Sequence, residues 1–257
     1  MHSADLHQQW TPQRAAAFQL APGVANLVAF VPFAWWFGQI GLPPFLALGV
    51  AILVAEIPVS WWLMVRETRR ESGTFSVRAA FPWLRPIPLW QYLVIGLPMI
   101  AISIAIIAGL GPIVSGGIRD ALPLNVPSWF LLEPDPEAFA QLSQPVLVSM
   151  WLTMLLIFAG VGGVTQELYA RGFLLPRTAH WGPWAPAFNA LLFGVFHLGS
   201  PWSWPVFALL ALPWAYAVWW KRSAKIGLFA HVGMLLMQSL MFSLLVFGLV
   251  SFEQLAG

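Results

Sequence analysis

The chain has 257 residues, of which 59% are hydrophobic and only 9% are charged, and its formal net charge is +2. A water-soluble domain carries roughly 25% charged residues, so this composition excludes one and predicts a polytopic membrane protein. The small net charge and the lack of a long basic run exclude a nucleic-acid-binding protein, and the absence of cysteine excludes disulfides, thiolate metal sites and cysteine nucleophiles.

Hydropathy predicts an all-α bundle of about seven transmembrane helices, in one membrane domain over residues 1–257. A spanning helix needs about 20 mostly apolar residues. The predicted spans are residues 22–41, 43–65, 91–114, 146–170, 185–199, 204–220 and 226–250. The fifth is short, so we expect it to be tilted or partly re-entrant. Residues 1–20 lack the pattern of a signal peptide, and we expect them to form a short interfacial helix.

The basic residues predict the orientation, because Lys and Arg stay on the cytoplasmic side of a membrane. Five arginines follow the second predicted span: Arg66, Arg69, Arg70, Arg78 and Arg85. If the predicted spans are counted from this segment, six further basic residues lie on the same side: Arg14, Arg171, Arg177, Lys221, Arg222 and Lys225. Only Arg119 lies on the outer side. We therefore expect the N-terminus in the cytoplasm and the acidic, proline-rich loop around residues 133–137 outside.

Five ionisable residues are expected at membrane depth: Glu56, Glu167, Arg171, His197 and His231. Each costs at least about 2.5–3.5 kcal/mol to insert, so such groups usually mark a cavity or a site. The fourth, fifth and seventh spans are expected to bring Gln166, Glu167, His197 and His231 to one level.

Structural readings of these residues stay open. Glu167 and Arg171 are four residues apart, which suits an ion pair on one helical face. Glu56, close before Pro58, is typical of a group that hydrogen-bonds one helix to another.

The chemistry of this set suits peptide hydrolysis inside a membrane. A carboxylate and a neutral imidazole together activate a water molecule as a general base. A second imidazole and an amide then stabilise the oxyanion that forms on the attacked carbonyl. Zinc is the weaker alternative, because the HExxH motif is absent and the three residues lie on three helices. We predict no cofactor and no metal.

At this point the residues resemble a known family. QELYARGFLLP at 166–176, FGVFH at 193–197 and His231 in the last span resemble the CPBP family over about residues 145–250. That family comprises the CAAX prenyl-protein endoproteases and the bacterial Abi or bacteriocin-processing relatives. Its motifs map onto Gln166, Glu167 and Arg171, then Phe193 and His197, then His231 and Leu235.

The resemblance implies a glutamic-type endopeptidase that acts on a membrane-associated protein, in a bacterial inner membrane. The first Glu of the family motif and His197 would activate water. His231 and a polar residue four positions later would stabilise the oxyanion, while Glu167 and Arg171 orient the site.

Two positions depart from the family pattern. Gln166 stands where the water-activating Glu is expected, and Leu235 stands where Asn or a similar polar residue is expected. Three explanations are open: a variant inactivated by Glu→Gln, a non-catalytic scaffold or regulator, or a site in which Glu167 or Glu56 supplies the carboxylate. The protease hypothesis predicts that Gln166→Glu raises proteolysis and that His197→Ala abolishes it. A transporter using Glu56 and Glu167 is disfavoured because no internal repeat is visible.

Overall fold

The computed structural model describes residues 9–122, 126–132 and 139–250, and all regular secondary structure in these ranges is helical. Five helical stretches are long and apolar enough to cross a membrane, which makes this an all-α integral membrane protein. They are Pro12–Gln39, Pro44–Ser72, Leu89–Ala121, Gln144–Trp181 and Ala224–Val246.

Three of these stretches contain π-helical turns within an α-helix. The second stretch consists of α2 (Pro44–Ala51), the π turn η1 (Ile52–Glu56) and α3 (Ile57–Ser72). The third consists of α5 (Leu89–Gln91), η2 (Tyr92–Gly96), α6 (Leu97–Ala105), η3 (Ile106–Leu110) and α7 (Gly111–Ala121). The fourth consists of α9 (Gln144–Leu152), η5 (Thr153–Gly162), α10 (Gly163–Glu167), η6 (Leu168–Leu174), α11 (Leu175–Thr178) and η7 (Ala179–Trp181). π turns inside α-helices are frequent at functional sites.

The remaining elements include two apolar helices that pack on each other, α12 (Trp184–Phe196) and α13 (Trp204–Lys221). They correspond to the fifth and sixth predicted spans, but neither is among the five stretches that are long and apolar enough to cross a membrane. The first and last of those five stretches are α1 (Pro12–Gln39) and α14 (Ala224–Val246). Short helical turns make up the rest: α4 (Val77–Ala80), η4 (Ser128–Phe130) and η8 (Pro201–Ser203).

The structure corrects two expected boundaries. Residues 12–20 are the first turns of α1 rather than a separate interfacial helix, because Thr11 caps the helix and Pro12 begins it. Residues 1–8 and the acidic, proline-rich loop around residues 133–137 lie outside the described residues. The fourth helix continues to Trp181, so Arg171 lies inside it and not at the cytoplasmic end where the charge count placed it. Its charge is tolerated there because it is buried against Glu167.

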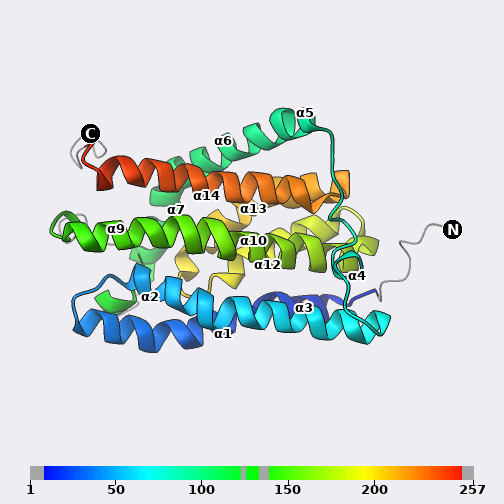
Figure 1. The fold of residues 1–257 in the computed structure, drawn as a ribbon, viewed down its shortest axis with the longest axis horizontal. Helices are drawn as coiled ribbons and strands as arrows, with labels where there is room; N and C mark the ends of the chain where they lie inside the picture. The colour runs from blue at the N-terminus through cyan, green and yellow to red at the C-terminus, as the bar shows by residue number, and fades with distance from the viewer. Residues whose placement is uncertain (1–8, 123–125, 133–138, 251–257) are drawn as a thin grey trace.

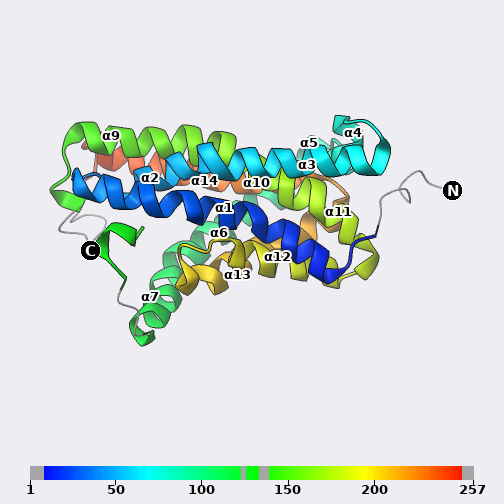
Figure 2. The ribbon, with the colours of Figure 1, turned by 90° about the horizontal axis from the view of Figure 1, so that it is seen from below.

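Helix α1 connects two parts of the bundle. It packs against α2 and η1 on one side and against α12 on another. Figure 1 shows α14, the α9–α10 stretch and the α2–α3 stretch as roughly parallel rows, and Figure 2 shows α1 between the α2–α3 stretch and the α12–α13 pair. Helix α1 therefore lies between elements that carry different predicted site residues.

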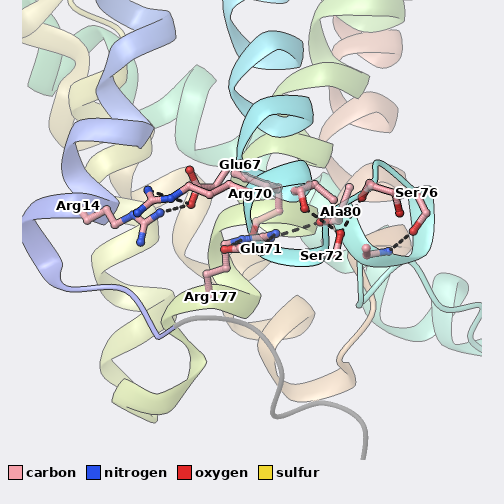
Figure 3. Close-up of polar contacts among 12 residues, drawn as sticks. Arg14, Glu67, Arg70, Glu71, Ser72, Ser76, Ala80 and Arg177 are labelled. Carbon is pink, nitrogen blue, oxygen red and sulfur yellow. Dashed lines mark hydrogen bonds and ion pairs between the residues drawn. The ribbon is translucent and has the colours of Figure 1, made fainter.

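A buried ionic cluster joins three helices at one end of the bundle (Figure 3). Arg14 at the start of α1 pairs with Glu67 in α3, and Arg177 in α11 makes two hydrogen bonds to Glu71, at 3.2 and 2.6 Å. The Arg177 guanidinium also lies 3.8 Å from the centre of the Phe173 ring. The start of α14 lies at the same end of the bundle (Figure 1). Most of the basic residues are in the segments at this end.

Candidate active site

Glu167 is the centre of a buried charged cluster. Its Oε1 accepts a hydrogen bond from Arg171 Nη1 at 2.7 Å and contacts His231 Nδ1 at 3.2 Å. The side chains of Glu167 and Arg171 are fully buried and that of His231 is nearly so. The structure thus contains the ion pair expected from the four-residue spacing, and it adds His231 from α14 to the same carboxylate oxygen.

Tight packing around Glu167 depends on a glycine. A Cβ atom added at Gly227, one helical turn before His231 on α14, would lie 2.5 Å from Glu167 Oε2. Within the described part of the chain, Glu167 Oε2 and Arg171 Nε and Nη2 are buried without a hydrogen-bond partner. Buried polar atoms are nearly always hydrogen-bonded, so these three atoms distinguish the cluster from an ion pair in which every polar atom is satisfied.

Aromatic rings fix the orientation of His231. Trp214 of α13 stacks on its imidazole with ring centres 4.8 Å apart, and Phe193 of α12 meets it edge-on at 5.7 Å. Trp214 is itself held by a hydrogen bond from its indole N–H to Ser103 Oγ in α6. Because the Glu167 carboxylate accepts a hydrogen bond from His231 Nδ1, that nitrogen carries a proton, and Nε2 is the ring nitrogen left to face a substrate.

His197 lies against the same phenylalanine. Its ring centre is 5.1 Å from that of Phe193 and 4.4 Å from that of Phe207. Its Nδ1 lies 2.9 Å from the Phe193 carbonyl oxygen, which can only accept, so Nδ1 carries the proton and Nε2 keeps a lone pair. The indole of Trp204 donates to the His197 carbonyl oxygen and fixes the end of α12.

Phe193 therefore lies among three of the predicted site residues. The Arg171 guanidinium lies 4.1 Å from the centre of its ring, in addition to the edge contacts with His197 and His231. The spacing of Phe193 and His197 in the second motif thus has a physical reason, since the phenylalanine holds the histidine through its carbonyl oxygen and ring.

Gln166 faces a different partner from its neighbour Glu167. Its Nε2 donates a hydrogen bond of 2.8 Å to Glu56 Oε1, and Asn26 Nδ2 of α1 donates to Glu56 Oε2 at 2.5 Å. Glu56 and Asn26 are buried, and Gln166 is partly exposed. The expectation that Glu56 hydrogen-bonds one helix to another is confirmed, since its carboxylate accepts from residues of two other helices, α1 and α10.

Sequence reasoning missed three contributors to this site. Asn26 was detectable from the sequence, because it is a polar residue within a predicted span, seven positions after Gln19. The structure shows that both side chains are buried. Trp214 and Gly227 gave no signal, since tryptophan and glycine are common in membrane helices and their roles depend on helix packing.

Comparison with known proteins supports the resemblance. Residues 148–237 match the family model described as type II CAAX prenyl endopeptidase Rce1-like. This match is similar in extent to the resemblance to the CPBP family, and residues 148–237 are called the Rce1-like domain below. No curated protein and no solved structure matches the chain.

The Rce1-like domain contains all five predicted site residues: Gln166, Glu167, Arg171, His197 and His231. Glu56 and Asn26 come from outside it, on helices that precede the matched residues. The hydrogen-bonded group of Gln166, Glu56 and Asn26 therefore contains residues of both the Rce1-like domain and the N-terminal helices.

Leu235 in the Rce1-like domain packs against the helix that carries Gln166. A Cβ atom added at Gly163 would lie 3.0 Å from Leu235 Cδ1. In the part of the chain that the structure describes, no three His, Asp or Glu side chains are grouped as ligands of one metal ion.

Proposed function

We propose that the chain is an intramembrane glutamic-type endopeptidase that hydrolyses a peptide bond of a membrane-associated protein. The observation that carries this proposal is the buried cluster in which Glu167 joins Arg171 and His231, with His197 against the same Phe193 ring, inside an Rce1-like domain. A protein of the CAAX protease family with this cluster at membrane depth is suited to hydrolysis away from bulk water.

The two histidines take different roles in this proposal. His197, with a lone pair on Nε2, accepts a hydrogen bond from the attacking water and works with a site carboxylate as the general base. His231, anchored by Glu167 through Nδ1, donates from a protonated Nε2 to the oxyanion, and the Glu167 carboxylate offsets its positive charge. Arg171 holds Glu167 in place through its 2.7 Å hydrogen bond.

The substrate and the setting belong to the same proposal. A peptide bond near the membrane end of a lipid-anchored or membrane-spanning protein suits the site, and we propose a bacterial inner membrane with the N-terminus in the cytoplasm. The support for this orientation is the distribution of basic residues, which gather where α1 and α14 begin and α3 ends.

The test is peptide-bond cleavage by the purified chain in detergent or nanodiscs. The probes are quenched fluorescent peptides, including farnesylated CAAX peptides and tails of membrane proteins. We expect cleavage by the chain and by Gln166→Glu, and a loss of at least about 10²-fold when His197→Ala is added to either one. The matched control is His180→Ala, an exposed histidine at a helix end, which should leave the rate unchanged. Cleavage that survives His197→Ala would contradict the mechanism.

A catalytically inactive scaffold or regulator is the second candidate function. It is favoured by Gln166 and Leu235, which stand where the resemblance implies a carboxylate and a hydrogen-bonding side chain. It predicts no cleavage by the chain and binding of a partner membrane protein that survives His197→Ala and His231→Ala. Crosslinking in membranes, compared between the chain and these variants, measures that binding.

A further inference from the structure

Glu56 is a buried carboxylate whose hydrogen-bond partners are both neutral. Asn26 and Gln166 each donate to one of its oxygens, and no described cation forms an ion pair with it. A buried charge is costly unless it is paired, and a contact between helices needs only an amide. An ionisable group kept at this depth without a counter-ion points to a functional use.

The position of Glu56 matches the function that Gln166 cannot perform. Gln166 occupies the position where the resemblance implies the water-activating carboxylate, and an amide does not take up a proton at neutral pH. Glu56 Oε1 lies 2.8 Å from Gln166 Nε2, so a carboxylate is present one hydrogen bond away from the motif position. Glu56 is the last residue of the π turn η1, and π turns inside α-helices are frequent at functional sites.

Helix α1 links the turn that carries Glu56 to the segment that carries His197. Gly23 packs directly on the carbonyl oxygen of Phe196, the residue before His197, so closely that a Cβ atom there would overlap it. Asn26 lies one turn further along α1 and holds Glu56 Oε2. One face of α1 therefore contacts both the end of α12 that carries His197 and the turn that carries Glu56.

We propose that Glu56 is the general base of the peptidase, replacing the carboxylate that Gln166 lacks. This rests on the proposed endopeptidase function. As the water oxygen bonds to the peptide carbonyl carbon, Glu56 takes one water proton and the C=O electron pair moves to the oxygen, which His231 stabilises. The C–N bond then breaks, the leaving amine takes the proton from Glu56, and the carboxylate is restored with one new acid and one new amine as products.

The decisive comparison exchanges the two side chains. Glu56→Gln removes the carboxylate with almost no change in shape, and Glu56→Gln/Gln166→Glu restores it at the other end of the same hydrogen bond. We expect Glu56→Gln to lower kcat/KM by at least about 10²-fold and the exchange to recover it to within about tenfold of the chain. Gel filtration and thermal unfolding of each variant report whether it is folded.

Each outcome decides the proposal. A folded Glu56→Gln variant that cleaves as fast as the unchanged chain overturns the proposal for Glu56. An inactive chain whose Gln166→Glu form cleaves also overturns it, but that result leaves the endopeptidase proposal intact. If no form cleaves any peptide in the panel, the endopeptidase proposal fails and this one fails with it. If Glu56→Gln does not fold, Glu56→Asp replaces it, and the expected result is a kcat at least tenfold lower with KM unchanged; an unchanged kcat overturns the proposal.

Discussion

Glu167 and His231, 64 residues apart in the sequence, meet in the middle of the bundle through a contact of 3.2 Å between Oε1 and Nδ1. The same oxygen accepts from Arg171, so one carboxylate atom holds a residue of its own helix and a residue of α14. The geometry of the candidate site therefore depends on this carboxylate keeping both of its partners.

Arg171→Met tests that dependence. It leaves Glu167 buried with only His231 as a partner, and we expect the free energy of unfolding to fall by about 3–5 kcal/mol. The double variant Glu167→Gln/Arg171→Met removes both charges and should recover most of that loss. Unfolding by denaturant in detergent micelles measures both, and a double variant that is less stable than Arg171→Met contradicts the expectation.

Gly227→Ala should disable the site through one methyl group. The added carbon would lie 2.5 Å from Glu167 Oε2, so the carboxylate or α14 must shift. A displacement of about 1 Å in a catalytic group costs on the order of 10²-fold in rate. Gly116→Ala in α7 is the matched control, because no atom lies within 4 Å of its added carbon. Equal cleavage rates for the two variants would mean that Glu167 has room to move without consequence.

Leu235→Asn introduces a hydrogen-bond donor four residues after His231. If the oxyanion forms near this turn of α14, the amide should raise kcat by about 10-fold or more. Leu235→Ala is the control, because it removes the same contact with the Gly163 region without adding a donor. A similar rise in both variants would assign the effect to space and not to hydrogen bonding.

Arg177 should be needed for stability and not for chemistry. Its buried guanidinium bonds Glu71 twice and lies over Phe173, away from Glu167 and both site histidines. We expect Arg177→Met to lower the free energy of unfolding by about 3–5 kcal/mol, since it leaves Glu71 without this partner. Arg66→Met, which changes an exposed arginine, should shift it by less than about 0.5 kcal/mol. The readouts are thermal unfolding and the cleavage rate of the folded fraction, which should not change.

The proposed orientation is testable by cysteine labelling, because the chain has no cysteine of its own. Thr74→Cys lies after α3 at the basic end, and Asp120→Cys lies at the end of α7. With a membrane-impermeant maleimide added to intact cells, we expect Asp120→Cys to be labelled and Thr74→Cys to react only after lysis. The opposite pattern would reverse the orientation.

Hydropathy predicted most of the fold because lipid requires a run of apolar residues of a fixed length. It placed the end of the fourth helix too early, since Arg171 looks like a cytoplasmic flank until Glu167 is seen to pair with it. That pair was itself predictable, because four-residue spacing is a local property of a helix.

The contacts between helices were not predictable in the same way. Gln166 meets Glu56 across 110 residues of sequence, and Trp214 stacks on His231 from a separate helix. No periodicity in one segment reports which residue of another segment it will face. The sequence could show that Gln166 lacks a carboxylate, but only the packing of α1 and η1 shows that one lies beside it.

The order of synthesis gives these pairings a further consequence. Ribosomes deliver the chain to the membrane from the N-terminus, so the helices enter the bilayer one after another. Asn26 precedes Glu56, and Glu167 precedes both Arg171, on the same helix, and His231, on a later one. Glu56, Arg171 and His231 are therefore each made after the residue that becomes their polar partner. Membrane insertion does not have to hold any of the three in lipid while it waits for a helix that is still to be translated.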